Sequence, residues 1–321
     1  MNRSNTILLI IAVLLILIGS IIFVGALFGS GWDFSILSQE NFETKTIDVN
    51  DKFGSISINA DEADVIFTPS SDGACRAVFY KSEDVECSAS VQNGTLVIKL
   101  IDKRKWYEHI GIYHESPKIT LYLPQDKYSS VSVKCTTSDV YIPGDFSFDN
   151  ATISVTTGDV RFEASASGSI KIHGTTGSVR LQDISAGTLD ISVSTGMVTL
   201  TNVNCAENIR IKVTTGKTEI TDIACQSFFS DGSTGDITMK SLIASNKISI
   251  ERSTGDVRFD KCDAAEISVD TDTGDVRGSL LSDKIFFVET DTGKVRVPRS
   301  ETGGRCEIET DTGNVTIEIA E

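Results

Sequence analysis

A Thr-Gly dipeptide recurs at almost constant spacing through the second half of this 321-residue chain. Successive glycines lie 19 or 20 residues apart, and they are Gly158, Gly177, Gly196, Gly216, Gly235, Gly255, Gly274, Gly293 and Gly313. Eight nearly equal intervals in succession indicate one repeated structural unit rather than an accident of composition. Thr137-Ser138-Asp139-Val140 keeps the spacing and adds a degenerate copy that lacks the glycine.

Apolar and polar residues alternate on both sides of each dipeptide. Around Thr195-Gly196, the apolar positions of one unit are Ile191, Val193, Val198, Leu200 and Val203. A period of two is typical of β-strands. A unit of about 19 residues is too short for a strand and the crossover helix that a βαβ unit requires. The repeat therefore consists of strands and turns.

One such unit cannot bury its apolar edge alone, but a stack of units buries those edges as continuous ladders. The sequence therefore predicts an all-β fold, a single-stranded parallel β-solenoid with repeats over residues 131–321. The crossover rule favours a right-handed β-helix. We expect each repeated glycine at a tight corner, where a positive φ is least costly for glycine.

Residues 45–130 contain strand-like runs without the 19- or 20-residue spacing, and they predict an irregular β cap that covers the first coil. Asn93-Gly94 lies between two strand-like runs, 86–91 and 95–100, and predicts a hairpin. At the other end, the last strand-like run, 315–319, reaches almost to the C-terminus. We expect an open edge there, through which the protein could associate with itself.

Residues 7–28 form an uncharged apolar run of 22 residues, long enough for a transmembrane helix. Arg3 precedes the run, so the positive-inside rule places the N-terminus in the cytoplasm and the rest outside. A cleavable signal peptide is the rival interpretation, but Gly29-Ser30-Gly31 is a poor cleavage site. We predict a single-pass protein of the cell membrane, with segments 1–6 (cytoplasmic), 7–28 (transmembrane), 29–44 (linker), 45–130 (cap) and 131–321 (solenoid).

The charge balance disfavours nucleic acid as a partner. Lys and Arg total 29 against 45 Asp and Glu, which gives a net charge of −16 and a pI near 4.6. Such a chain lacks the positive field that a phosphate backbone needs. Three histidines leave little material for a histidine-based metal or catalytic site, and no cofactor is predicted.

Acidic residues repeat in the last three complete turns. Stacking predicts two columns of carboxylates, one of Asp270, Glu289 and Glu309 and the other of Asp272, Asp291 and Asp311. Carboxylates about 5 Å apart repel one another, and hard oxygen ligands arranged in this way could recruit Ca²⁺. The alternative is a set of solvated carboxylates whose repulsion is relieved by neighbouring Lys and Arg, and the absence of the glycine-rich calcium-binding nonapeptide favours it.

Arginine follows many of the turn aspartates by two residues. The pairs are Asp159/Arg161, Asp256/Arg258 and Asp275/Arg277, and Arg180 and Arg296 occupy the same offset in other units. Residues i and i+2 share a face of a strand, so these charges can interlock between coils and keep an outer face soluble. A binding groove for sugar or peptidoglycan is the second interpretation.

The cysteines and histidines allow weaker hypotheses. Cys205 and Cys225 should be neighbours in adjacent coils, where they could bridge or be buried as small apolar side chains. Cys75 and Cys87 are a second possible pair. His109 and His114 have poor spacing for a metal site and predict a loop packed over the cap. His173, expected in a turn, has no partner evident in the sequence, so no catalytic residue is predicted.

The theme Thr156-Thr-Gly-Asp-Val-Arg161, which recurs at 253–258 and 272–277, resembles a bacterial β-strand-repeat family known as "putative adhesins". The resemblance covers roughly residues 45–321. It implies a surface-exposed, non-enzymatic solenoid with a single N-terminal membrane helix. The predicted function is therefore adhesion or interaction with the envelope, through a cell-wall or host-surface polymer. Alternatives are a self-assembling envelope scaffold, an envelope-stress regulator and, less favoured, an enzyme that acts on polysaccharides.

Overall fold

The computed structural model describes residues 3–29, 42–83, 85–102 and 116–320, and the side chains of its one helix only at 11–25 and 28. Helix α1 (Arg3–Gly29) belongs to one unit of the chain and the β-strands form another. Every described side chain of α1 is exposed. His109 and His114, and most of the predicted linker, lie outside the described residues.

Among the described residues, no helix combines the length and the apolar character that a membrane crossing requires.

The second unit contains 23 strands joined in one continuous network of pairings. The strands are β1 (Phe42–Val49), β2 (Ser55–Ala60), β3 (Asp64–Pro69), β4 (Cys75–Ser82), β5 (Glu86–Gln92), β6 (Thr95–Ile101), β7 (Lys118–Leu123), β8 (Lys127–Thr137), β9 (Val140–Ile142), β10 (Ser147–Thr157), β11 (Val160–Phe162), β12 (Ser165–Thr176), β13 (Val179–Thr195), β14 (Val198–Cys205), β15 (Asn208–Thr215), β16 (Thr218–Thr234), β17 (Ile237–Thr254), β18 (Val257–Thr273), β19 (Val276–Leu280), β20 (Lys284–Thr292), β21 (Val295–Arg296), β22 (Gly304–Thr312) and β23 (Val315–Ile319).

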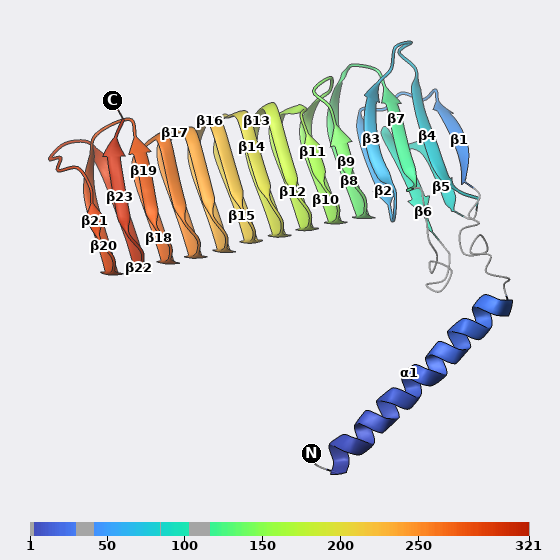
Figure 1. The fold of residues 1–321 in the computed structure, drawn as a ribbon. Coiled ribbons are helices and arrows are strands. Elements are labelled where there is room, and N and C mark those ends of the chain that lie inside the picture. Colours follow the sequence, from blue (N-terminus) through green and yellow to red (C-terminus); the bar gives the residue numbers. More distant parts are fainter. Residues whose placement is uncertain (1–2, 30–41, 84, 103–115, 321) are drawn as a thin grey trace. The chain divides into compact units, whose positions relative to one another are not determined.

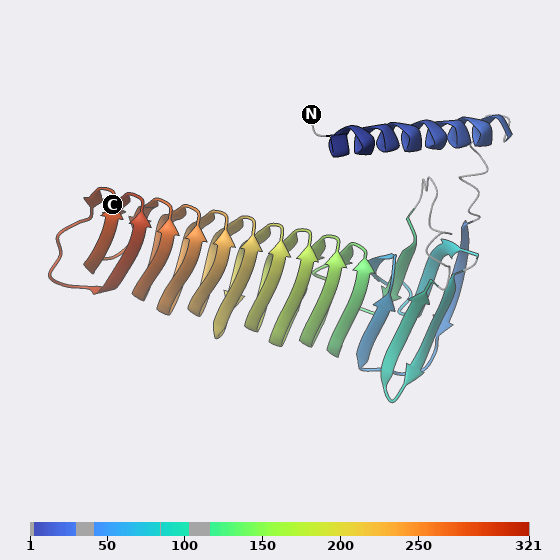
Figure 2. The same cartoon turned by 90° about the horizontal axis from the view of Figure 1, so that it is seen from below.

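These strands form a parallel β-solenoid, as the sequence predicted, with its coils side by side in one elongated row (Figures 1 and 2). Two of its faces matter here. Face A contains β8, β10, β12, β15, β20 and β22 and the later halves of β13, β16, β17 and β18. Face B contains β3, β9, β11, β14, β19, β21 and β23 and the earlier halves of the same four long strands.

The repeated glycines stack at one corner between the faces. Six of them, Gly158 to Gly255, have φ between 132° and 154°, as expected. Gly274, Gly293 and Gly313 do not have a positive φ in the left-handed range, so that expectation fails for them. All nine share a different constraint: an added Cβ would lie 1.7–2.2 Å from a backbone oxygen of the neighbouring coil. Crowding between coils therefore requires glycine here, and φ adds to it at six positions.

A second stacked corner lies at the other end of face B in five coils and was not predicted. It is formed by non-glycine residues with φ of 51° to 55°, namely Asp183, Asn202, Asp222, Ser241 and Lys261. Their spacing repeats the period of the glycines, at 19 or 20 residues. Asp and Asn tolerate this left-handed conformation better than most residues, which explains three of the five.

The core follows from the alternation of the strands. Inward-facing residues stack in columns, such as Ile170, Leu189, Ile209 and Phe228 on face A. These four side chains are at most 1% exposed. Neighbouring coils therefore bury each other's apolar edges, which is the physical reason that the repeat predicts a solenoid.

Antiparallel strands cover the N-terminal end. β1 pairs with β4 and β4 with β7, and β5 pairs with β6. The predicted hairpin is confirmed, because Gln92 faces Thr95 across a turn formed by Asn93 (φ 50°) and Gly94 (φ 74°). Two positive φ values in a two-residue turn are typical of a type I′ hairpin.

The C-terminal coils are not stacked in chain order. β22 pairs with both β18 and β20, and β23 pairs with both β19 and β21. The coil of Gly313 is therefore inserted between the coils of Gly274 and Gly293, and Figure 1 shows β22 and β23 in that position. The predicted open edge at 315–319 is thus wrong: β20 and β21 form the terminal coil.

Candidate functional site

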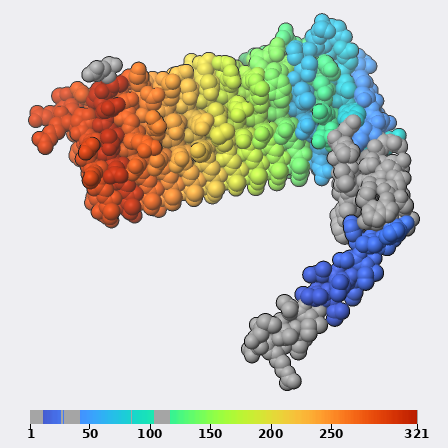
Figure 3. Space-filling model, viewed as in Figure 1, coloured from blue at the N-terminus to red at the C-terminus, as the bar shows by residue number. Residues whose placement is uncertain are grey.

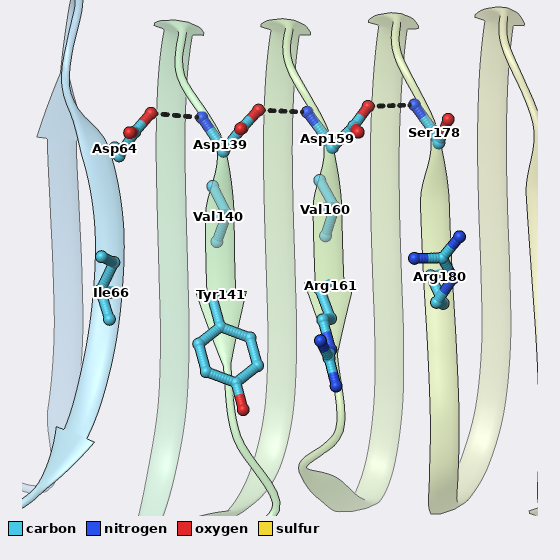
Figure 4. A pocket seen from close by; sticks show the side chains of 10 residues that line it. All are labelled: Asp64, Ile66, Asp139, Val140, Tyr141, Asp159, Val160, Arg161, Ser178 and Arg180. Atoms are coloured by element: carbon cyan, nitrogen blue, oxygen red, sulfur yellow. Dashed lines mark hydrogen bonds between the residues drawn. The ribbon is translucent and has the colours of Figure 1, made fainter. Parts of the chain in front are cut away.

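Aspartates at the glycine corner of face B form a hydrogen-bonded ladder. Asp139 Oδ1 accepts the backbone N–H of Asp159 at 2.7 Å, and Asp159 Oδ1 accepts that of Ser178 at 2.7 Å. Asp64 begins this ladder by accepting the N–H of Asp139 at 3.0 Å (Figure 4). These carboxylates therefore connect one coil to the next.

The ladder has a gap where the residue after the glycine has no carboxylate, at Ser178, Met197 and Lys217. It resumes at Asp236, which accepts the N–H of Asp256 at 3.0 Å. It then continues through Asp256, Asp275 and Asn314, with donor–acceptor distances of 3.0, 2.8 and 3.1 Å, and its final donor is the N–H of Lys294.

A single column of outward-facing residues runs along face B beside this ladder. In spatial order it contains Ile66, Tyr141, Arg161, Arg180, Thr199, Glu219, Thr238, Arg258, Arg277, Thr316 and Arg296. We call it the arginine column. The predicted alignment of arginines between coils is present, and one predicted interlock forms directly: Arg277 donates to Asp256 of the preceding coil at 3.1 Å.

A groove of about 380 Å³ lies over the first part of the arginine column. Its walls are formed by the aspartate ladder and by Tyr141, Arg161 and Arg180, which all point from neighbouring strands toward the same side (Figure 4). The strands of this region present one continuous surface (Figure 3). The regular alternation of β9, β11 and β13 places these three side chains outward.

Tyr141 and Arg161, which line this groove, form one cluster with Glu163. Arg161 Nε donates to Glu163 Oε1 at 2.6 Å, and Tyr141 Oη donates to Glu163 Oε2 at 3.2 Å. The guanidinium carbon of Arg161 lies 5.2 Å from the centre of the Tyr141 ring. Partial burial, and then the Glu163 carboxylate, raise the pKa of Tyr141, so its hydroxyl remains a hydrogen-bond donor at neutral pH. The cluster offers an aromatic surface next to a cation.

Arg180 is different from Arg161. Its side chain is exposed and has no hydrogen bond or ion pair to any described residue. It stands next to Arg161 in register, one coil further along. An unpaired guanidinium presents a planar set of donors that matches a carboxylate or phosphate.

The arrangement recurs further along the same face. A second groove, of about 650 Å³, is lined by Arg258 and Arg277 and by Thr316 and Glu318 of the inserted coil. Arg277 is paired with Asp256, whereas Arg258 has no side-chain partner among the described residues. Arg258 lies four coils after Arg180 in the arginine column, at a distance of about 19 Å.

The predicted acidic columns exist, but in a different order. Asp270 is in register with Glu309, and Glu309 with Glu289, because the last coil is inserted. In the part of the chain that the structure describes, no group of three or more acidic, His or Cys side chains is arranged to hold a metal ion. The calcium hypothesis for Asp270, Asp272, Glu289, Asp291, Glu309 and Asp311 therefore gains no geometric support.

The cysteines are all free thiols. The possible bridges between Cys205 and Cys225 and between Cys75 and Cys87 are absent. Cys205 and Cys225 are buried, which agrees with the apolar alternative. Burial raises the pKa of Cys225 and of Cys306 to about 12, so these thiols are poor nucleophiles.

His173 lies on strand β12 and faces outward, so its predicted place in a turn is wrong. Sequence reasoning found the arginine column but missed Tyr141 and Glu163. Tyr141 follows Asp139 by two residues, at the offset of the arginines, so the pattern held a usable signal for it. No comparable signal identified Glu163, because it follows the short strand β11 outside the alternation.

Comparison with known proteins identifies the family. Residues 53–217 and 204–321 match the Toastrack DUF4097 family. The chain belongs to the Toastrack DUF4097 family. The two Toastrack segments together run from the cap to the inserted coil, which supports the resemblance noted from the sequence. No curated protein matches the chain.

Three solved structures are similar to this Toastrack chain. A "putative adhesin" from Parabacteroides distasonis is 12% identical, with a TM-score of 0.50, covering 85% of this chain and 99% of that one. A "putative adhesin" from Bacteroides fragilis is 17% identical (TM-score 0.47; 74% and 97% covered). A "putative cell adhesion protein" from Clostridium sporogenes is 10% identical (TM-score 0.27; 88% and 100% covered). At these identities, the first comparison shows a shared fold.

Proposed function

We propose that this Toastrack protein is a non-enzymatic adhesion module of the cell surface that binds an acidic polysaccharide along face B. The observation that carries the proposal is the unpaired Arg180, which lies in the same groove of about 380 Å³ as Tyr141 and two coils from it along the arginine column. An aromatic ring and an unpaired guanidinium about 10 Å apart in one groove suit a chain of sugars that bear carboxylates, because the ring contacts the apolar face of one sugar and arginine binds the carboxylate of another.

The geometry of the arginine column supports a linear ligand. Arg161 and Arg180 are adjacent rungs, as are Arg258 and Arg277, and both pairs lie on the same face. A chain of acidic sugars laid along the solenoid can reach both grooves, so that two weak contacts reinforce each other. The net charge of −16 and the aspartates that line the first groove oppose the approach of an acidic polymer, so binding depends on the arginine column.

The test is binding of polygalacturonate, with neutral dextran as the control polymer. We expect Arg180→Gln and Arg258→Gln each to weaken binding at least about fivefold, and the double variant more. Arg210→Gln is the matched control, because Arg210 is an exposed arginine on face A that contacts Phe229. Equal binding by the wild type and the double variant would refute the site.

The absence of turnover is part of the same proposal and has its own measurement. Polygalacturonate incubated with the protein should show no new reducing ends and no unsaturated products. The release of either would instead support the less favoured enzymatic alternative.

Attachment to the membrane through residues 7–28 remains our proposal for localisation, with the solenoid outside the cell. Its support is the uncharged, apolar character of this run and the position of Arg3. The expected result is that alkaline carbonate leaves the full chain in the membrane fraction, and that a chain without residues 1–29 is released. Protease added to intact cells should digest the solenoid; protection of the solenoid would refute the topology.

A second candidate function is self-assembly through the terminal coil. Ile285, Phe287 and Val295 on β20 and β21 are 37%, 49% and 43% exposed, and the outer edges of both strands are unpaired among the described strands. We propose a second copy as the occupant, with each β20 antiparallel to the partner's β21. The terminal coil carries acidic residues such as Asp291 and basic residues such as Arg296, so two copies can meet there without an excess of one sign of charge.

Sedimentation velocity tests this candidate. The wild type should form dimers at micromolar concentration, and Phe287→Lys should remain monomeric. Ile243→Lys is the matched control, because Ile243 is 41% exposed in a middle coil, away from the edge. A wild type that stays monomeric throughout would remove the scaffold function.

A further inference from the structure

The gap in the aspartate ladder leaves three neighbouring backbone amides without an acceptor. They are the N–H groups of Met197, Lys217 and Asp236, which lie in three successive coils. In the part of the chain that the structure describes, none of the three donates a hydrogen bond. All three residues lie between strands at the glycine corner, so strand pairing does not use these amides either.

The other coils show which group fits in front of such an amide. At seven equivalent corners, the amide donates to a side-chain oxygen of the neighbouring coil at 2.7–3.1 Å. Six of these acceptors are aspartates and the seventh is Asn314. Figure 4 shows Ser178 as the last donor before the gap. The corner is therefore shaped to receive a carboxylate oxygen, and in the gap the protein supplies none.

The gap also changes the charge of the corner. Where the rest of the ladder consists mostly of aspartates, the gap contributes the exposed ammonium of Lys217, which has no ion pair among the described residues. Glu219, two residues further on, is the opposing charge of that coil. The carboxylate of Asp159 lies one coil from the acceptor position of Met197, and Asp139 and Asp159 already have that spacing. An added carboxylate is thus no more crowded than those of the ladder.

The free amides lie in the coils where the arginine column has no arginine. The column contains Thr199, Glu219 and Thr238 in these coils, each two residues after a free amide. Arg180 belongs to the coil before them and Arg258 to the coil after them. Donors for an anion therefore continue from one groove to the other, first as guanidinium groups, then as backbone amides, and again as guanidinium groups.

We propose that the free amides of Met197, Lys217 and Asp236, together with the Lys217 ammonium, bind carboxylates of the ligand that spans the two grooves. The identity of that ligand, an acidic polysaccharide, rests on the function proposed above. Its carboxylate oxygens take the places that aspartate oxygens occupy in the other coils, and such charge-assisted hydrogen bonds are stronger than neutral ones. The polymer is then held along the whole path of about 19 Å between Arg180 and Arg258.

The small number of methionines makes one of these amides easy to observe. The chain has three, so selective ¹⁵N-methionine labelling of the full-length protein in detergent gives a simple amide spectrum. We expect polygalacturonate to move the Met197 amide proton downfield in a saturable way. Met239, which is 0% exposed, should not move and serves as the internal reference. Neutral dextran should move neither signal.

The outcomes separate this site from the proposed function. If polygalacturonate binds through Arg180 but the Met197 amide does not respond, the assignment of the gap is overturned and the proposed function stands. If the polymer does not bind at all, the proposed function fails. Free galacturonate at about 100 mM, which occupies even a weak site, then tests the gap alone against sodium chloride of the same ionic strength. A Met197 amide that responds to neither polymer nor monomer overturns the assignment.

A variant that fills the gap from within tests the amide itself. Ser178→Asn keeps the net charge and offers its side-chain oxygen to the Met197 amide, as Asn314 does to Lys294 at 3.1 Å. We expect it to abolish the Met197 response and to weaken polygalacturonate binding about threefold. Ser192→Asn makes the same chemical change on face A and should retain both. A full Met197 response in Ser178→Asn contradicts the proposal.

The charge of the gap has a separate test. Lys217→Met removes the ammonium and leaves the backbone amides in place, and we expect it to weaken polygalacturonate binding about fivefold. Lys212→Met, on face A in the preceding strand β15, is the matched control and should bind as the wild type does. Equal binding by both variants would remove Lys217 from the site.

Discussion

The two ends of the solenoid protect their edge strands in different ways. At the N-terminal end, antiparallel β1, β4 and β5 cover the row, and Phe79 in β4 is 0% exposed. At the C-terminal end, β20 and β21 form the outermost coil. The chain then turns back, and β22 and β23 form the coil between this outermost coil and that of β18 and β19. The apolar side chains of β20 and β21 remain partly exposed. A dedicated cap thus buries an end more completely than an additional repeat does.

The largest expected effect is the loss of the inserted coil. In the described sheet, β20 pairs only with β22, and β21 only with β23. A chain that ends at Arg299 should therefore lose all hydrogen-exchange protection in β20 and β21. Deletion of residues 42–49, which form β1, is the matched change at the other end, and there β4 keeps its pairing with β7. Protected β20 amides in the shortened chain would contradict this account.

A core substitution at each end gives the next largest difference. Phe79→Ala removes a fully buried ring from the cap and should cost about 3–5 kcal/mol of unfolding free energy. Phe286→Ala removes a half-buried ring from the terminal coil and should cost about 1–2 kcal/mol. Urea denaturation measures both. Equal costs would mean that the terminal coil is as well packed as the cap.

Replacing a glycine should cost more stability at a corner of the coils than at a turn of the cap. Gly216→Ala places a Cβ 1.7 Å from Gly196 O at a φ of 140°, so we expect a loss of about 3 kcal/mol. Gly94→Ala at the cap hairpin meets no atom within 4 Å, and only its φ of 74° is unfavourable. Its expected cost is about 1 kcal/mol. Similar Tm values for the two variants would show that crowding at the corner is relieved by movement of the coil.

The smallest expected difference concerns the aspartate ladder. Asp139→Ala removes an acceptor from the N-terminal end of the ladder and should cost about 1–2 kcal/mol. Lys294 ends the ladder with its backbone amide alone, so Lys294→Ala should change stability by less than about 0.5 kcal/mol. Chemical denaturation of both variants measures whether the Asp139 carboxylate stabilises the protein by connecting two coils.

The fold could be predicted from the sequence because the residues that repeat every 19 or 20 positions have the same structural role in each coil. Gly158 and its eight equivalents mark a corner where only glycine fits, and the alternation of apolar residues marks the strands. The second corner escaped notice because Asp183, Ser241 and Lys261 differ in type while sharing one backbone conformation. At that corner, the left-handed backbone conformation recurs at regular spacing, but no single residue type recurs with it.

The order of the last coils could not be predicted. Val276, Val295 and Val315 are equivalent in pattern, so the pattern alone does not assign an order to their coils. The connections decide the order, and their sequences contain no repeat. The grooves were partly predictable: the offset after the turn aspartates marks Arg161 and Arg180, whereas Glu163 depends on the local path of the chain after β11.

The crowded glycine corner also limits how the length of such a protein can change. Coils of 19 and 20 residues both keep the glycines stacked, because the extra residue lies in a register shift away from the corner, as between Ala244 and Lys247. The gain or loss of a whole repeat also leaves the corner intact. The reach of the rod is thus adjustable in steps of one coil, about 4.8 Å each. Any spacing between binding grooves on it is a whole multiple of that step.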